Sequence, residues 1–277
     1  MTFWEKLEKL DRRIIYAIIT VAVVLPFFFR MGLPISVSPE VKAVYDYIDN
    51  LSPNDVVFIA GDYDPQVDAE LAPMFEAIVR HCFEKNVKLV VANVYNPQGV
   101  GLVEPRLKKL AQEYKKVYGV DYVFLGWKYG ASLLIMKMGQ DFKSAWEVDY
   151  YNTRLEDLPL TSKIHNYEDI ALVVDLTGSG AYISWIYFAY VQYKQKIAAG
   201  ITAVMAADSY PYLQAGQLVG LLGGLRGAAE YEQLVHHPGL ASVGMEAQSW
   251  AHVAIILFII MGNLGYFMVR RKKQSGK

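Results

Sequence analysis

Cysteine is nearly absent from this sequence of 277 residues, because Cys82 is the only one. A single cysteine cannot form an intramolecular disulfide, so the chain must be stabilised by its hydrophobic core. Cys82 itself falls on an apolar helical stripe, which predicts a buried thiol rather than a reactive one. The five histidines show no metal-ligand spacing, so we expect neither a metal site nor a cofactor.

Catalytic signatures are missing as well. The sequence contains no G-x-S-x-G, so a hydrolase built on a nucleophile elbow has no local support. It also contains neither G-x-x-x-x-G-K-[ST] nor G-x-G-x-x-G, the two glycine-rich signatures of nucleotide phosphate binding. With no catalytic motif present, we do not expect the chain to be an enzyme.

Positive charge is scarce in the middle of the chain. Residues 31–249 carry 17 Lys and Arg against 25 Asp and Glu, a net charge of −8, although the whole chain has a net charge of only −1. The balancing basic residues gather at the two ends, including Arg12 and Arg13 near the start and Arg270 and Arg271 near the end. An acidic middle repels polyanions, so nucleic acid is not an expected partner.

Two long apolar segments lie at the ends of the sequence. Residues 250–269 run without a charged side chain, and a helix of about 20 residues covers the roughly 30 Å hydrocarbon core of a bilayer. The first apolar segment, residues 14–29, is shorter, but Arg30 can snorkel outward while the apolar face continues. We therefore predict transmembrane helices at 14–33 and 249–269, with the lipid bilayer as a partner.

The basic flanks predict the orientation of these spans, since short segments rich in Lys and Arg stay in the cytoplasm. A cleaved signal peptide is the alternative for the first segment; its acidic start and the lack of an A-x-A site argue against that alternative. We therefore expect a cell-membrane protein with both termini cytoplasmic and its main domain outside. The predicted parts are a tail at 1–13, a span at 14–33, an extracytoplasmic domain at 36–248, a span at 249–269 and a basic tail at 270–277.

The middle of the sequence alternates strands and helices. Short apolar runs ended by turn residues predict buried strands at 55–61, 88–95, 121–126, 170–176 and 200–206. Apolar residues at helical spacing predict helices between them, ending with a long helix over 212–234. Residues 127–167 lack a clear period and predict an irregular insertion. The pattern is typical of an α/β, doubly wound fold with a mostly parallel sheet of about five strands, a Rossmann-like arrangement.

Polar residues follow several predicted strands, and ligands in open parallel sheets bind beyond the strands' carboxyl ends. The small turn after the fourth strand would expose N–H groups to an anion, and the aspartates after the first could surround a divalent cation. The alternatives are ordinary turn and capping roles for both groups, which we favour. The candidate ligand-binding residues are Asp62, Asp64, Thr177, Gly178, Ser179 and Asp208.

Two predicted helices favour assembly. The helix over 180–193 has large apolar side chains almost all round, so a single sheet face cannot bury them all. The helix over 212–234 carries a series of glycines, which would allow another helix to approach closely. Packing inside the same domain is the alternative for the glycines. The candidate interface residues are Trp185, Tyr187, Tyr190, Gly216, Gly220 and Gly224.

These features together predict a membrane-anchored structural or interaction subunit, part of a homo-oligomer or of a complex with other membrane subunits. The alternative is a membrane-tethered domain or enzyme that binds a small anion or a nucleotide at the carboxyl ends of the strands. A transporter is not favoured, because two spans in one chain give no pathway.

Overall fold

The computed structural model describes residues 11–29, 32 and 35–275, and the chain divides into two compact units. One unit comprises Met1–Pro34 together with Val243–Lys277, and the other is Ile35–Ser242. The predictions for residues 1–10, 30, 31, 33, 34, 276 and 277 fall outside the described residues. Those for the rest of the chain can be compared with the structure.

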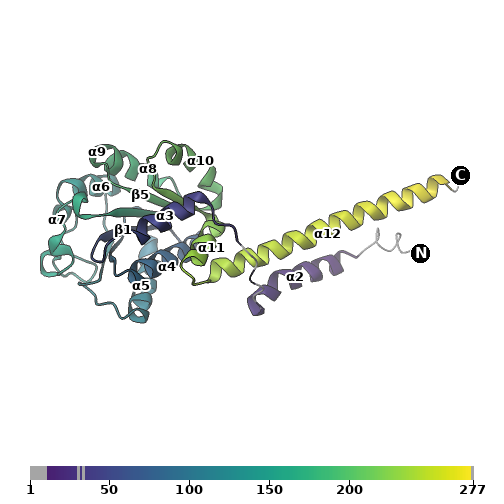
Figure 1. Cartoon of the computed structure of the whole chain (residues 1–277), viewed down its shortest axis with the longest axis horizontal. Helices are drawn as coiled ribbons and strands as arrows, with labels where there is room; N and C mark the ends of the chain where they lie inside the picture. Colours follow the sequence, from purple (N-terminus) through teal and green to yellow (C-terminus); the bar gives the residue numbers. More distant parts are fainter. Residues whose placement is uncertain (1–10, 30–31, 33–34, 276–277) are drawn as a thin grey trace. The chain divides into compact units, whose positions relative to one another are not determined.

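The central unit is built around a six-stranded parallel sheet in the order β3-β2-β1-β4-β5-β6 (Figure 1). Four strands, β1 to β4, arise from the short apolar runs that predict strands in the sequence; β5 overlaps its predicted run only at 200–201, and β6 was not predicted. The strands are β1 Val56–Asp62, β2 Lys88–Asn93, β3 Tyr122–Trp127, β4 Leu172–Thr177, β5 Ile197–Ile201 and β6 Gly220–Gly223. This order confirms a doubly wound, Rossmann-like sheet, with one strand more than predicted.

Helices cover both faces of the sheet (Figure 1). The helices α4 Asp68–Glu84, α5 Val100–Glu113 and α11 Gly224–Leu234 line one face, and α3 Pro39–Asp49 packs against β6 and α11. On the other face lie α6 Ala131–Gln140, α8 Ala181–Trp185, α9 Val191–Tyr193 and α10 Ala203–Gln214. Between α8 and α9 the residues Ile186–Tyr190 form a π-helical turn, so 181–193 is one continuous helical segment.

Two predictions for the last third of the central unit are wrong. The predicted strand at 200–206 is β5, which ends at Ile201, and α10 begins at Ala203. The predicted helix over 212–234 is interrupted by β6, because Gly216 and Gly224 adopt φ values of +69° and +59°. Left-handed backbone of this kind ends a helix and is accessible to glycine at little cost.

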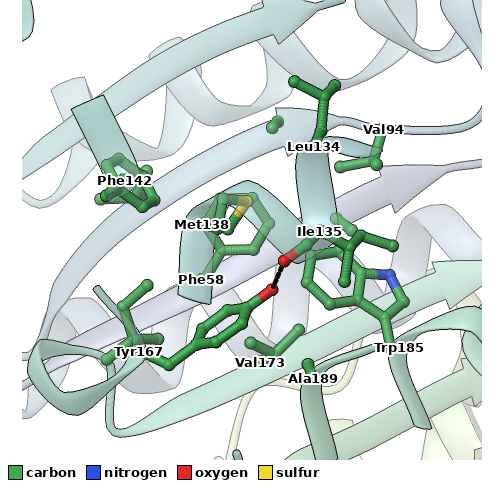
Figure 2. Close-up of a cluster of buried hydrophobic side chains, with 14 of the residues drawn as sticks. Phe58, Val94, Leu134, Ile135, Met138, Phe142, Tyr167, Val173, Trp185 and Ala189 are labelled. Atoms are coloured by element: carbon green, nitrogen blue, oxygen red, sulfur yellow. Dashed lines mark hydrogen bonds between the residues drawn. The ribbon is translucent and has the colours of Figure 1, made fainter. Parts of the chain in front are cut away.

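Residues 127–167 contain more regular structure than the predicted irregular insertion. They form α6, the short helix α7 Phe142–Ala145 and the 3₁₀ turns Leu155–Asp157, Thr161–Lys163 and Tyr167–Asp169. The apolar face of α6 packs over the helical segment 181–193. Figure 2 shows Ile135 and Met138 of α6 beside Trp185, Ala189 and the sheet, with the Tyr167 hydroxyl donating a hydrogen bond to the Ile135 carbonyl at 2.7 Å.

The described part of the unit formed by the chain ends contains the helices α2 Arg12–Phe28 and α12 Leu240–Ser275, of which α12 begins within the central unit. Among the described residues, one helical stretch, Leu240–Arg271, is long and apolar enough to cross a membrane. It includes the predicted second span at 249–269. The predicted first span is helical, but α2 has 17 residues, fewer than the about 20 that a span requires, so two transmembrane helices are not supported.

Candidate functional site

The strand order places a topological switch point between β1 and β4, because the chain leaves these neighbouring strands toward opposite faces of the sheet. Asp62 is the last residue of β1, and Thr177 is the last residue of β4. These two residues are partners in the β1–β4 register, as are Ala60 and Asp175. Because side chains alternate between faces along a strand, Asp62, Asp175 and Thr177 share one face of the sheet.

Asp62 is held firmly through one of its two carboxylate oxygens. Its Oδ1 accepts hydrogen bonds from the backbone N–H groups of Val94 at 2.6 Å and Tyr95 at 2.8 Å, and a longer one from Asn96 at 3.4 Å. These donors belong to the chain that follows β2, so the loop after β2 orients the carboxyl group. Its other oxygen, Oδ2, is buried and has no hydrogen-bond partner in the described part of the chain.

Asp175 lies one step deeper in the sheet and is fully buried. Neither of its carboxylate oxygens has a hydrogen-bond partner among the described residues. Its neighbours in the same row of the sheet are Ala60 on β1 and Ala199 on β5, so no large side chain stands beside it there. An ionised carboxylate in such a place is strongly disfavoured unless a proton, a cation or a hydrogen-bond donor compensates it.

Both carboxyl groups have raised pKa values. Burial raises the pKa of Asp62 to about 7, although the N–H groups of Tyr95, Val94 and Asn96 act in the opposite direction. Burial also raises the pKa of Asp175 well above its usual range, and the nearby charge of Asp62 raises it further. Like charges in one buried site disfavour full ionisation, so the pair retains a proton near neutral pH unless a cation replaces it.

The Thr177 side chain lies at the end of β4, on the same face of the sheet as the two carboxyl groups. Thr177 Oγ1 lies 3.0 Å from Ser179 Oγ and accepts a hydrogen bond from the Ser179 N–H at 3.1 Å. The turn after β4 also meets the loop after β1, since a Cβ atom on Gly178 would lie 3.0 Å from the Val67 side chain. The two loops therefore pack against each other at the switch point.

The structure brings together only part of the predicted ligand site. Asp62, Thr177, Gly178 and Ser179 gather at the ends of β1 and β4, as described above. Asp64 lies in the loop after β1, where its carboxylate accepts the Gln66 N–H at 2.8 Å, the turn role favoured as the alternative. Asp208 is exposed on α10, after β5, because that strand ends earlier than predicted and a helix follows it.

Sequence reasoning missed Asp175, the most deeply buried member of the site. The signal was present, since Asp175 is the one charged residue inside an otherwise apolar strand sequence, LVVDLT. A carboxylate within a buried parallel strand is costly and therefore marks a candidate functional residue. Within the described residues no group of three or more His, Cys, Asp or Glu forms a metal centre, so any cation here would rely on this carboxyl pair and on hydroxyl or solvent oxygens.

The predicted interface residues are distributed differently from the expectation. Trp185 is completely buried in the domain's own core, which corrects its assignment to a surface between subunits. Tyr187 remains 59% exposed, and Tyr190 is partly buried beside Lys194. Gly220 packs inside the domain, because a Cβ atom there would clash with the Glu40 carbonyl of α3.

Comparison with known proteins adds no further constraint. No protein-family model, no curated protein and no solved structure matches this chain.

Proposed function

We propose that the chain is a membrane-anchored binding domain in which Asp62 and Asp175 hold a divalent cation of the Mg²⁺ or Ca²⁺ class. One observation carries this proposal: Asp62 Oδ2 and both oxygens of Asp175 are buried without a partner among the described residues. A cation supplies the positive charge that these oxygens lack. The site offers oxygen atoms from carboxylates and hydroxyls, the ligands that hard cations prefer.

The cation would in turn receive a small anionic ligand at the strand ends. Mg²⁺ is commonly held by one or two protein carboxylates together with phosphate oxygens of a substrate. The switch point of a doubly wound sheet is the usual place for such ligands. Without the cation, two carboxyl groups would repel an anion, so we expect binding of a phosphorylated ligand to depend on the metal.

Thermal unfolding of the full chain tests this function. At pH 7.5 we expect MgCl₂ or CaCl₂ to raise the Tm in a saturable manner, because a ligand that binds only the folded state stabilises it. Addition of ADP or ATP with the metal should raise the Tm further. At pH 5 the metal effect should disappear, since protonated carboxyl groups bind no cation.

Matched variants make this test specific. Asp175→Asn should abolish the response to metal, whereas Asp208→Asn changes an exposed aspartate on α10 and should respond like the parent. A Tm that depends on pH but not on any divalent cation would show that the pair binds protons alone, and the proposed function would fail.

The membrane arrangement is the second part of the proposal. Leu240–Arg271 would span the bilayer, and the basic residues after it would keep the C-terminus in the cytoplasm. The apolar helix α2, which is not long enough to qualify as a span, would lie at the membrane interface. The acidic central unit, with its binding site, would then face outward.

A role in assembly is a second candidate function, favoured by a specific observation. Tyr187 and Val191 are 59% and 48% exposed on the segment 181–193, even after α6 has covered the rest of its apolar surface. Exposed apolar residues that lie on one helix are typical of contact surfaces. A second copy of the chain, or another membrane subunit, would cover them.

A further inference from the structure

A second candidate site lies at the same edge of the sheet, next to the end of β3. A groove of about 600 Å³ is bordered there by aromatic side chains that include Trp127, Trp146 and Tyr150. Trp127 and Tyr150 are 40% and 46% exposed, which is unusual for rings of this size on a monomer's surface. The neighbouring Tyr129 is even more exposed, and its ring lies edge-on to that of Trp127.

The backbone is shaped to present these rings. The register between β2 and β3 shifts between the pairs Val91–Phe124 and Asn93–Trp127, so β3 contains an irregularity just before Trp127. Gly126 has a φ of +71°, and a Cβ atom there would lie only 2.8 Å from the Tyr150 ring. A bulge of this kind redirects the following side chain, and the glycine lets the Tyr150 ring lie directly on the strand.

The loop that carries Tyr150 is fixed rather than free. Asp149 is buried, and its Oδ1 accepts hydrogen bonds from the N–H groups of Tyr151 at 2.9 Å and Thr153 at 2.8 Å. Its other oxygen accepts the Tyr118 hydroxyl at 2.7 Å. The aromatic border is therefore held in place before any ligand arrives, which reduces the entropy lost on binding.

Polar groups with spare hydrogen-bonding capacity lie between the rings. The side chains of Glu147 and Asn152 line the groove and make no hydrogen bond or ion pair with the other described residues. The Trp146 Nε1–H, which belongs to another lining residue, is buried without an acceptor among them. Lys128 Nζ donates to the Ala145 carbonyl at 2.9 Å and retains two further donor positions.

We propose that this groove binds a neutral saccharide chain. The apolar C–H face of a pyranose ring packs on exposed Trp and Tyr rings, while its hydroxyl groups both donate and accept hydrogen bonds. Hydroxyl donors suit the free Glu147 carboxylate, and the Asn152 amide can both donate and accept. Aromatic surface combined with a few oriented polar groups is the usual composition of a small-ligand site.

Two other ligands of aromatic grooves fit less well. Single-stranded nucleic acid also stacks on aromatic rings, but its phosphates would approach Glu147 in an acidic domain. Proline-rich peptides dock on aromatic grooves too, yet proline has no N–H to donate to the free carboxylate. The saccharide site stands independently of the proposed cation site, because it shares none of that site's residues.

Calorimetric titration of the full chain tests the proposal, with the protein kept in a detergent that has no sugar headgroup. The probes are chitotetraose, cellotetraose and maltotetraose, with decaproline as the comparison ligand. We expect at least one tetrasaccharide to bind and decaproline not to bind. Trp127→Ala and Tyr150→Ala should each weaken saccharide binding about tenfold or more, as truncation of an aromatic anchor commonly does.

Two further variants separate a site from a general effect on folding. Gly126→Ala removes no ring but displaces Tyr150, so it should also weaken binding while the circular dichroism spectrum stays unchanged. Tyr187→Ala removes an even more exposed ring from another element and should bind like the parent. The proposal is overturned if none of the tetrasaccharides binds, if decaproline binds in their place, or if the groove variants keep the parent's affinity.

Discussion

Asp175 is the residue on which the proposed cation site depends most. Its carboxyl group is fully buried, has no hydrogen-bond partner among the described residues, and lies near a second buried carboxyl group, Asp62. Such a residue destabilises the folded state whenever it is ionised and uncompensated. Residues that reduce stability in this way are typical of binding sites, where function opposes stability.

The first prediction follows from this cost. Asp175→Asn should raise the free energy of unfolding by about 1 to 3 kcal/mol at pH 8 in the absence of metal, because it removes a carboxyl group that must take up a proton on folding or remain ionised without a partner. The measurement is thermal unfolding followed by near-ultraviolet circular dichroism. Asp208→Asn should leave the Tm unchanged. A loss of stability in Asp175→Asn at pH 8 would show that the ionised carboxylate has a stabilising partner.

The second prediction concerns the pH dependence of stability. Asp62 and Asp175 have raised pKa values in the folded state, so the folded chain binds more protons than the unfolded chain between about pH 4 and pH 7. The stabilisation that this pair contributes is therefore fully present below the pKa of the unfolded chain. It is lost as the pH rises through the pKa values of the folded chain. In metal-free buffer the Tm of the parent should fall from pH 5 to pH 8 relative to that of Asp175→Asn.

The comparison with Asp175→Asn removes the contribution of another buried group. His81 is buried between Tyr45 and Tyr231, and burial lowers its pKa. The contribution of His81 to stability changes with pH in the opposite direction. It is present above the unfolded pKa of about 6.5 and is lost as the pH falls below that value. The parent and Asp175→Asn both contain His81, so its effect cancels in the difference between their Tm values. If that difference does not change with pH, the pH dependence does not come from the carboxyl pair.

At the scale of elements, α11 holds the first and the last segment of the central unit through two buried glutamates. Glu230 accepts hydrogen bonds from the Ser38 N–H at 2.8 Å and the Ser38 hydroxyl at 2.6 Å, at the start of α3. Glu232 accepts the N–H groups of Gly239, Ala241 and Ser242 at 2.8 to 3.1 Å and thereby caps the first turn of α12. One helix thus fixes both the start of α3 and the start of α12 within the central unit.

The third prediction tests the capping role. Glu232→Gln should lower the free energy of unfolding by about 1.5 to 3 kcal/mol, since hydrogen bonds to a charged acceptor contribute that much and a neutral amide accepts them less well. Chemical denaturation of the full chain measures the change. Glu156→Gln alters an exposed glutamate and serves as the control. Equal stability of the two variants would mean that the cap contributes nothing.

The elements differ in how well the sequence predicted them. Strands β1 to β4 were predictable, because each is a short and mostly apolar run between turn residues or helical patterns. Strand β6 was not, since its sequence GLLG is short and lies between helical patterns, and only the positive φ of Gly216 and Gly224 separates it from them. A glycine in sequence does not reveal whether it provides a smooth helical surface or a left-handed turn.

The candidate site was predictable only in part, for a related reason. Asp62 and the turn after β4 follow predicted strands, so their meeting at one edge follows from the rule for parallel sheets. Asp175 was hidden because it occupies a strand position instead of a loop. The aromatic groove depends on a bulge at Gly126 and on the loop around Tyr150, and non-local packing of this kind leaves no periodic signal in the sequence.

At the scale of the whole molecule, the fourth prediction concerns topology. The central unit should lie outside the cytoplasm, because the basic residues flank the apolar segments. A new thiol at the exposed Gln98 in a Cys82→Ala background should react with a membrane-impermeant maleimide in intact cells. The parent serves as the control, since its Cys82 is buried and should not react. Labelling that requires cell lysis would place the domain in the cytoplasm.

The fifth prediction concerns assembly. Tyr187 is the most exposed large apolar residue on the segment 181–193, and burying such a side chain at an interface contributes about 1.5 to 3 kcal/mol. Tyr187→Glu should therefore shift the full chain to smaller species in light scattering, with an unchanged circular dichroism spectrum. Lys137→Glu changes a partly exposed charge on α6 and is the control. If the parent is already monomeric at high concentration, self-assembly through this surface is excluded.

Mn²⁺ titration followed by electron paramagnetic resonance measures directly whether Asp62 and Asp175 form a cation site. Free aqueous Mn²⁺ gives a strong signal that is lost on binding, so the titration counts sites. We predict one Mn²⁺ bound per parent chain at pH 7.5, displaced by excess Mg²⁺ or Ca²⁺, and none bound at pH 5 or by Asp175→Asn. Undiminished free Mn²⁺ with the parent at pH 7.5, or equal binding by Asp175→Asn, would contradict the cation site.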